Sequence, residues 1–198
     1  MISLDRRSST LGTSSVYEHL RKEFSMKATL LLTGRPGVGK TTVIKAVAQS
    51  LGDRAGGFYT EEISGPGGRK GFRLVTLDGR DAIMAHIDLR SSERPRVSRY
   101  GVDVTAIERV GVRAIEQAMK HEKIVVIDEI GKMELFSGSF KSVVLQAIGR
   151  HVVIATVMAK PNPWVEGLTL MPKVTLWEVT AQNRDRMVQQ VMDWVKGR

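Results

Sequence analysis

The sequence predicts an α/β fold in three α/β/α layers, with a mainly parallel sheet between helices. Continuous apolar runs at 28–33, 124–127 and 151–157 are typical of buried parallel strands. Residues with helical periodicity separate these runs, as expected for strand–helix–strand units. The loops that follow the strands should therefore gather at one edge of the sheet, where open α/β sheets bind ligands.

The expected elements follow in order from residue 28. After the strand at 28–33, apolar residues recur at helical spacing from Lys40 to Leu51, and Gly52 is placed to end that helix. Turn-rich segments then predict a small antiparallel hairpin insert near 57–80. The remaining elements are expected as a helix that begins at a capping box over 105–108, a strand at 124–127, a helix at 139–148, strands at 151–157 and 173–179, and a closing amphipathic helix at 182–196.

The first 27 residues differ from the rest of the chain. They are rich in Ser, Thr and Arg and lack a strong apolar period, and the pair Arg6-Arg7 is not followed by the apolar stretch of a secretory signal. We expect residues 1–27 to be an N-terminal extension and residues 28–198 to be a single domain.

Composition narrows the classes of function. With 198 residues, 42% of them hydrophobic and 26% charged, the chain fits a globular domain with a sizeable core. The absence of cysteine excludes disulfides and thiolate metal sites and is typical of a cytoplasmic protein, and no apolar run is long enough to predict a membrane span. The net charge of +9 suits a nucleic acid or a polyphosphate substrate, but no basic run interleaved with aromatic residues supports a nucleic acid. The oligomeric state stays open.

A glycine-rich segment between the first strand and the first helix matches a known phosphate-binding pattern. Residues 34–42 contain Gly, four residues and Gly-Lys-Thr, the pattern of the Walker A phosphate loop. Glycines allow the backbone amides to face an anion, and the helix N-terminus adds to that attraction. We expect Lys40 to reach the β- and γ-phosphates of a nucleoside triphosphate and Thr41 to bind Mg²⁺. The candidate binding residues are Gly34, Arg35, Pro36, Gly37, Val38, Gly39, Lys40, Thr41 and Thr42.

Two adjacent acids end the second apolar run. Asp128 and Glu129 follow residues 124–127 directly, at the strand end where ligands bind in such sheets. We expect Asp128 to hold Mg²⁺ together with Thr41, and Glu129 to polarise an attacking water.

Several segments taken together resemble one family. The segments 34–42, 57–62 (Gly-Phe-Tyr-Thr-Glu-Glu), 128–135 (Asp-Glu-Ile-Gly-Lys-Met-Glu-Leu) and 179–184 (Val-Thr-Ala-Gln-Asn-Arg) occur in this order. With them, residues 28–198 resemble the nucleoside-triphosphatase family of P-loop proteins from thermophilic microbes, which has a human relative called cancer-related nucleoside-triphosphatase. The resemblance implies the P-loop NTPase fold and slow Mg²⁺-dependent hydrolysis of ATP, GTP, CTP and UTP to diphosphate and phosphate. It also implies broad base selectivity, and the sequence contains no Asn-Lys-x-Asp segment that would read guanine.

Hydrolysis also requires a positive charge near the γ-phosphate as the bond breaks. Arg184 lies in the family-like segment 179–184, so it joins Lys40 and Glu129 as a catalytic candidate, with an ordinary helix-start ion pair as the alternative. The other candidates are Arg35, Arg96, Arg99 and Lys132.

Two other functions remain open at this level. A nucleotide or nucleoside kinase would need a lid that excludes water, and the basic stretch 90–99 could supply it. A nucleotide-dependent switch that acts on a nucleic acid or a protein is compatible with the net charge.

Overall fold

The structure, a computed structural model, describes residues 27–198; the expected extension over 1–27 lies outside the described residues except for Lys27. The strands are β1 (Thr29–Thr33), β2 (Ala55–Gly65), β3 (Gly68–Thr76), β4 (Asp81–His86), β5 (Arg96–Val97), β6 (Tyr100–Val102), β7 (Ile124–Ile130), β8 (Val153–Val157) and β9 (Val174–Glu178). The helices are α2 (Lys40–Leu51), η1 (Gly52–Arg54), α3 (Val104–Ala106), η2 (Ile107–Val112), α4 (Arg113–Lys120), η3 (Glu134–Phe136), α5 (Gly138–Arg150), α6 (Pro163–Thr169) and α7 (Arg184–Lys196).

One nine-stranded sheet runs through the molecule in the order β5-β6-β4-β3-β2-β7-β8-β1-β9. From β2 to β9 the neighbouring strands pair in parallel, and from β2 to β5 they pair antiparallel. All five residues of β8 are buried, because helices cover both faces of the parallel part. The predicted α/β architecture is thereby confirmed.

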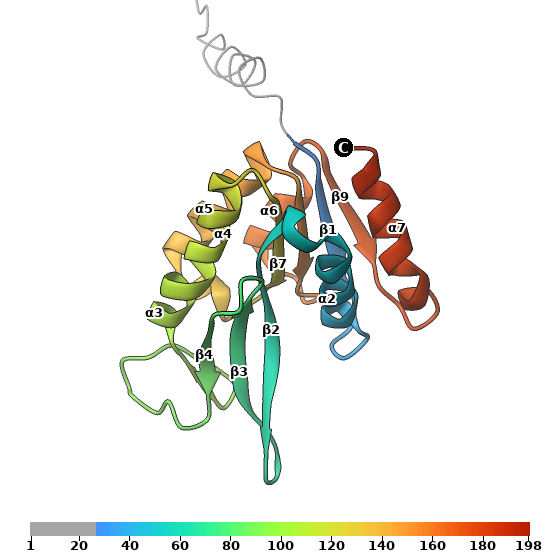
Figure 1. Cartoon of the computed structure of the whole chain (residues 1–198). Helices are drawn as coiled ribbons and strands as arrows, with labels where there is room; N and C mark the ends of the chain where they lie inside the picture. Colours follow the sequence, from blue (N-terminus) through green and yellow to red (C-terminus); the bar gives the residue numbers. More distant parts are fainter. Residues whose placement is uncertain (1–26) are drawn as a thin grey trace, which may run out of the picture.

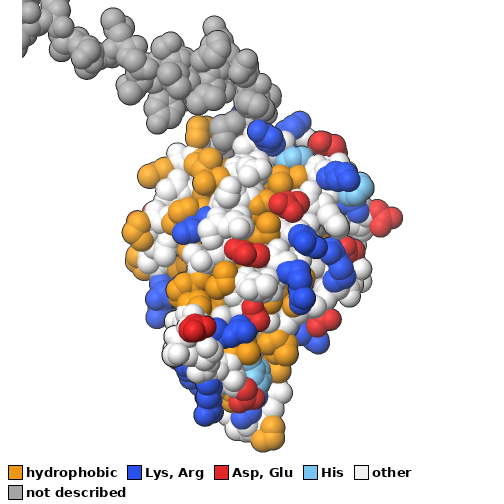
Figure 2. Space-filling model, turned by 90° about the vertical axis from the view of Figure 1, so that its left-hand side faces the viewer, with side chains coloured by type: hydrophobic (Ala, Val, Ile, Leu, Met, Phe, Trp, Pro, Cys, Tyr) orange, Lys and Arg blue, Asp and Glu red, His pale blue; other side chains and the backbone are white. Residues whose placement is uncertain are grey.

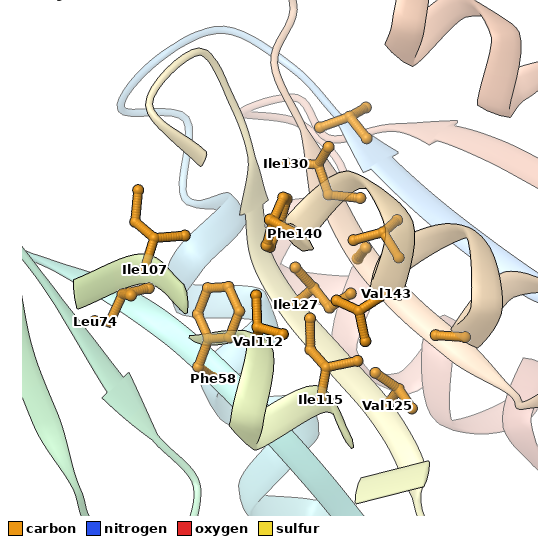
Figure 3. Packing of buried hydrophobic residues seen from close by; sticks show 14 of the residues in the cluster. Phe58, Leu74, Ile107, Val112, Ile115, Val125, Ile127, Ile130, Phe140 and Val143 are labelled. Atoms are coloured by element: carbon orange, nitrogen blue, oxygen red, sulfur yellow. The ribbon is translucent and has the colours of Figure 1, made fainter. Parts of the chain in front are cut away.

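Helices form the two outer layers around the parallel strands (Figure 1). Alternate residues of one strand enter different cores, since strand side chains point to opposite faces. Leu30 and Leu32 of β1 pack with α2 and α7, whereas Leu31 belongs to the cluster that includes α4 and α5. Figure 3 shows the second cluster, where Phe58 of β2 lies near Phe140 of α5 with ring centroids 6.3 Å apart.

The antiparallel insert is larger than the sequence suggested. The expected hairpin is present as β2 and β3, which are joined by a turn between Gly65 and Gly68. Strands β4, β6 and β5 extend the sheet further. The helix α6 was not predicted from the sequence. Strands β5 and β6 are only two and three residues long, and the buried residues of β4 do not alternate with exposed ones, so these strands have no strong local pattern.

The helix before β7 begins two residues earlier than the predicted capping box. Asp103, not Thr105, is the N-cap, and its carboxylate accepts a hydrogen bond of 3.0 Å from the Ala106 N–H. The next segment, η2, is a π-helical turn in which Gly111 lies against Phe58 and Leu74; a Cβ at Gly111 would approach each of them to 3.4 Å. The small residue lets this helix approach the sheet closely.

The surface carries charges of both signs. On the face drawn in Figure 2, Lys and Arg side chains are interspersed with Asp and Glu, without one continuous basic stripe. Among the described residues, no helix has the length and apolarity that crossing a membrane requires.

Candidate active site

The phosphate loop connects the end of β1 to the first residue of α2. Gly34, Gly37 and Gly39 have positive φ angles of 145°, 77° and 111°, which glycine adopts without strain. At Gly34 space is also limiting, because a Cβ there would lie 2.4 Å from the Val179 carbonyl oxygen. The loop conformation therefore depends on glycine at its start and on close contact with the segment after β9.

Lys40 lies inside the loop rather than on the surface. Its ammonium donates a 3.0 Å hydrogen bond to the Gly34 carbonyl and lies 3.6 Å from Oε2 of Glu129. Only 9% of its side chain is exposed. The lysine thus brings its positive charge to the point where the phosphate loop meets the end of β7.

Asp128 is fully buried and receives donors from three elements. Thr41 of α2 donates to Oδ2 at 2.8 Å, and Thr156 of β8 donates to Oδ1 at 2.6 Å. Thr60 of β2 contributes its hydroxyl and its N–H to Oδ2, at 3.3 and 3.4 Å. These bonds orient the carboxylate toward the phosphate loop.

Thr60 and Thr156 were not among the predicted site residues. Thr60 lies in the family-like segment 57–62, so a signal for it was present, although the strand pattern alone did not set it apart. Thr156 is a hydroxyl residue in an otherwise apolar strand, and its role follows only from the pairing of β7 with β8.

The donor set fits a magnesium ion. Mg²⁺ prefers oxygen ligands and is usually held by one or two protein groups together with substrate phosphates and water. The carboxylate of Asp128 and the hydroxyl of Thr41 supply such oxygens next to each other, at the N-terminus of α2. Both predicted metal ligands therefore lie together.

Glu129 occupies a different environment from its neighbour. The pairing of β7 with β8 is interrupted between Ile127 and Ile130, so both acids leave the regular ladder. The Glu129 side chain is 35% exposed. Partial burial raises the pKa of its carboxyl, and the charge of Asp128 acts in the same direction, while Lys40 opposes them. A carboxylate with a raised pKa that faces a lysine is suited to accept a proton.

Arg184 lies along the phosphate loop. Its guanidinium donates to the Val38 carbonyl at 3.5 Å, and its Cδ is 3.5 Å from the position of a Cβ on Gly39. It also contacts Asp185 at 3.5 Å, so the helix-start ion pair is present as well.

The other candidate cations divide into two groups. Arg35 and Lys132 are exposed and follow β1 and β7 directly, on the same edge as Lys40. Arg96 and Arg99 lie in the β5–β6 hairpin, which β4, β3 and β2 separate from β7. Their guanidiniums donate to backbone carbonyls of the insert, so the structure does not bring them to the phosphate loop.

The fold and this arrangement define a P-loop protein that binds a nucleoside triphosphate, and comparisons with known proteins specify the family. The model of the NTPase family matches residues 29–192. Nucleoside-triphosphatase THEP1 of Thermotoga sp. (strain RQ2) is 41% identical over 168 residues, which span 84% of this chain and 95% of that protein. The chain belongs to the NTPase family, a family of nucleoside-triphosphatase enzymes.

Two solved structures resemble the whole described fold. The crystal structure of THEP1 from the hyperthermophile Aquifex aeolicus is similar with a TM-score of 0.76 and 36% identity, covering 84% of this chain and 98% of that one. The solution structure of a human cancer-related nucleoside triphosphatase is similar with a TM-score of 0.74 and 34% identity, covering 86% and 98%. The family resemblance noted in the sequence is confirmed.

Proposed function

We propose that this protein hydrolyses nucleoside 5′-triphosphates, with Mg²⁺, to the diphosphate and inorganic phosphate. The observation that carries the proposal is the meeting of the phosphate loop and β7: Thr41 contacts Asp128 at 2.8 Å while Lys40 lies 3.6 Å from Glu129. These contacts support a metal site at Thr41 and Asp128 with a cation and a base, Lys40 and Glu129, beside it. The names of its relatives support the same reaction class.

Each group has a defined task in the proposed mechanism. The loop amides and Lys40 bind the β- and γ-phosphates and fix their position. Glu129 accepts a proton from a water molecule whose oxygen bonds to the γ-phosphorus, while the bond to the β–γ bridging oxygen breaks and leaves the diphosphate. When bound, Mg²⁺ neutralises charge on the phosphate oxygens, and Asp128 and Thr41 are the residues that would hold it.

Arg184 is our candidate for the additional positive charge. Its contact with the Val38 carbonyl keeps the guanidinium beside the phosphate loop. A cation in that place stabilises charge that develops on the leaving diphosphate.

We further propose that ATP, GTP, CTP and UTP are all substrates. The roles proposed above concern the triphosphate and not the base, and the Asn-Lys-x-Asp segment that would select guanine is absent from the sequence.

The basic stretch 90–99 gives little support to the alternative of a kinase. Arg90 donates to the Ile87 carbonyl, and Arg94 pairs with Asp103 at 3.0 Å. With Arg96 and Arg99 bonded to carbonyls of the insert, these guanidiniums stabilise the insert itself. They are not arranged as a lid over the phosphate loop.

The decisive experiment compares phosphate release by the wild-type protein and by Glu129→Gln. With Mg²⁺ and each of the four triphosphates, we expect acceptor-independent release of phosphate. The variant should keep nucleotide affinity and lose turnover by about 10²-fold, since the amide cannot accept the proton. Glu116→Gln, which changes an exposed glutamate on α4, is the matched control.

Two outcomes would contradict the proposal. Near-wild-type turnover by Glu129→Gln would remove this residue from the role of base. Turnover that appears only after a nucleoside or monophosphate is added, with labelled phosphate transferred to it, would identify a kinase instead.

A further inference from the structure

A second glutamate is buried directly behind Glu129. Glu134 is the first residue of η3, four residues after the end of β7, and only 4% of it is exposed. Its Oε2 accepts a hydrogen bond of 3.1 Å from the Gly131 N–H. That bond closes the turn through which the chain leaves β7, so the conformation of the segment that carries Glu129 depends on Glu134.

Gly131 separates the two carboxyl groups. A Cβ on Gly131 would lie 2.9 Å from Oε1 of Glu129 and 3.0 Å from Oε2 of Glu134. Both oxygens therefore flank the same small space, which a side chain at position 131 would fill. The φ angle of Gly131 is not positive, so the need for glycine here is one of space.

The buried position determines the charge of Glu134. Burial raises the pKa of its carboxyl to about 8, and the negative charges of Glu129 and Asp128 add to this effect, while the backbone N–H groups of Glu134 and Gly131 oppose it. Glu134 is therefore a neutral carboxylic acid at pH 7. The other charged residues of the surrounding elements are Glu108 and Arg109 on η2, Lys132 in the loop after β7, and Lys141 and Arg150 on α5. Glu108 accepts a hydrogen bond from Ser137 at 2.8 Å.

We propose that Glu134 is the positioning residue for Glu129: as a neutral acid it holds the Gly131 turn and keeps Glu129 as the carboxylate that faces the attacking water. The inference rests on the proposed hydrolysis. In this proposal, Glu134 acts only in its protonated form. Ionisation of Glu134 would place a further negative charge beside Asp128 and Glu129 and push Glu129 out of position.

The substitution Glu134→Gln distinguishes an ionised Glu134 from a neutral one. If Glu134 acted as a charged group, replacement by an uncharged amide would remove its function at every pH. If it acts as a neutral acid, glutamine reproduces its size, its lack of charge and an acceptor oxygen for the Gly131 N–H.

The test is the pH profile of kcat and KM for ATP hydrolysis by the wild-type protein, Glu134→Gln and Glu134→Ala. We expect wild-type kcat to fall above pH about 8. Glu134→Gln should stay within about threefold of wild type at pH 7, and its alkaline fall should move up by at least about one pH unit. Glu134→Ala, which leaves the Gly131 N–H without its acceptor, should lower kcat by about tenfold with little change in KM. Glu116→Gln should reproduce the wild-type profile.

A folded Glu134→Gln protein that keeps the wild-type alkaline limb, or that loses activity at pH 7 like Glu129→Gln, would overturn the inference. A second readout does not require turnover: the carboxyl ¹³C shift of Glu134, assigned by its loss in Glu134→Gln, should titrate far above the usual range of glutamate. Titration within the usual range would overturn the inference even in an active enzyme. Absence of hydrolysis by the wild-type protein would instead overturn the proposed function.

Discussion

At the scale of single residues, the site depends on two adjacent acids that have different surroundings. Asp128 is fully buried and held by Thr41, Thr60 and Thr156, whereas Glu129 is partly exposed and faces Lys40. Donors from three elements orient the carboxylate of Asp128, whereas partial burial raises the pKa of Glu129, so the two acids are suited to different tasks. In the proposed mechanism, Asp128 binds a cation and Glu129 exchanges a proton.

Removal of the loop lysine should abolish function. In Lys40→Ala the backbone amides remain, but they alone do not replace the lost charge toward the β- and γ-phosphates. We expect nucleotide affinity to fall by at least about tenfold and phosphate release to become undetectable, as measured by calorimetric titration and phosphate assay. Lys196→Ala, at an exposed position near the end of α7, should behave as wild type. A Lys40→Ala protein that binds nucleotide with normal affinity would show that the loop amides are sufficient.

At the scale of elements, β2 connects the parallel and antiparallel parts of the sheet. Residues 55–58 of β2 pair with β7 and residues 58–65 pair with β3, so Phe58 takes part in both pairings. The ring is fully buried between η2 and α5. The same strand carries Thr60, so packing at Phe58 fixes the position of a group that contacts Asp128.

We expect Phe58→Ala to destabilise the protein by about 3–5 kcal/mol, because the change removes a large buried side chain and leaves a cavity. The measurement is urea unfolding at equilibrium. Phe136→Ala is the matched control: this side chain is 44% exposed and should cost less than about 1 kcal/mol. A small effect at Phe58 would mean that η2 moves to fill the space.

The elements also show how far the sequence determined the fold and the site. The strands at 124–127 and 151–157 were predictable because burial on both faces leaves a continuous apolar signal. Asp103 as the cap was not predictable, because the choice falls between neighbouring polar residues. The strand β4 was not predictable either, because its buried and exposed residues do not alternate regularly. The phosphate loop and the two acids follow from local motifs, but the role proposed for Glu134 depends on its burial and on its hydrogen bond with Gly131.

At the scale of the whole molecule, the candidate site lies at the carboxyl ends of the parallel strands, and the amino ends of these strands lie on the opposite side of the sheet. The phosphate loop and the end of β7 lie at the carboxyl ends, and the described chain enters β1 from the amino ends (Figure 1). The family match begins at residue 29, which agrees with a domain that starts near residue 28. That boundary remains a prediction.

Deletion of residues 1–25, with Met26 as the first residue, should therefore leave ATP hydrolysis unchanged. The deletion spares Ala28, whose carbonyl accepts a hydrogen bond of 3.2 Å from Val153. The measurement is kcat/KM of the shortened and the full chain at equal concentrations of folded protein. A shortened protein that folds but does not release phosphate would assign a functional role to the extension.

The contact between Gly34 and the Val179 carbonyl has a consequence for motion. Val179 donates its N–H to the Thr33 carbonyl at 2.8 Å, and the segment that follows it leads into α7, which carries Arg184. The phosphate loop is thus joined to the start of α7 both through Val179 and through the contact of Arg184 with the Val38 carbonyl. We therefore expect occupation of the loop to reduce the motion of α7, which is about 150 residues away in sequence but adjacent in space.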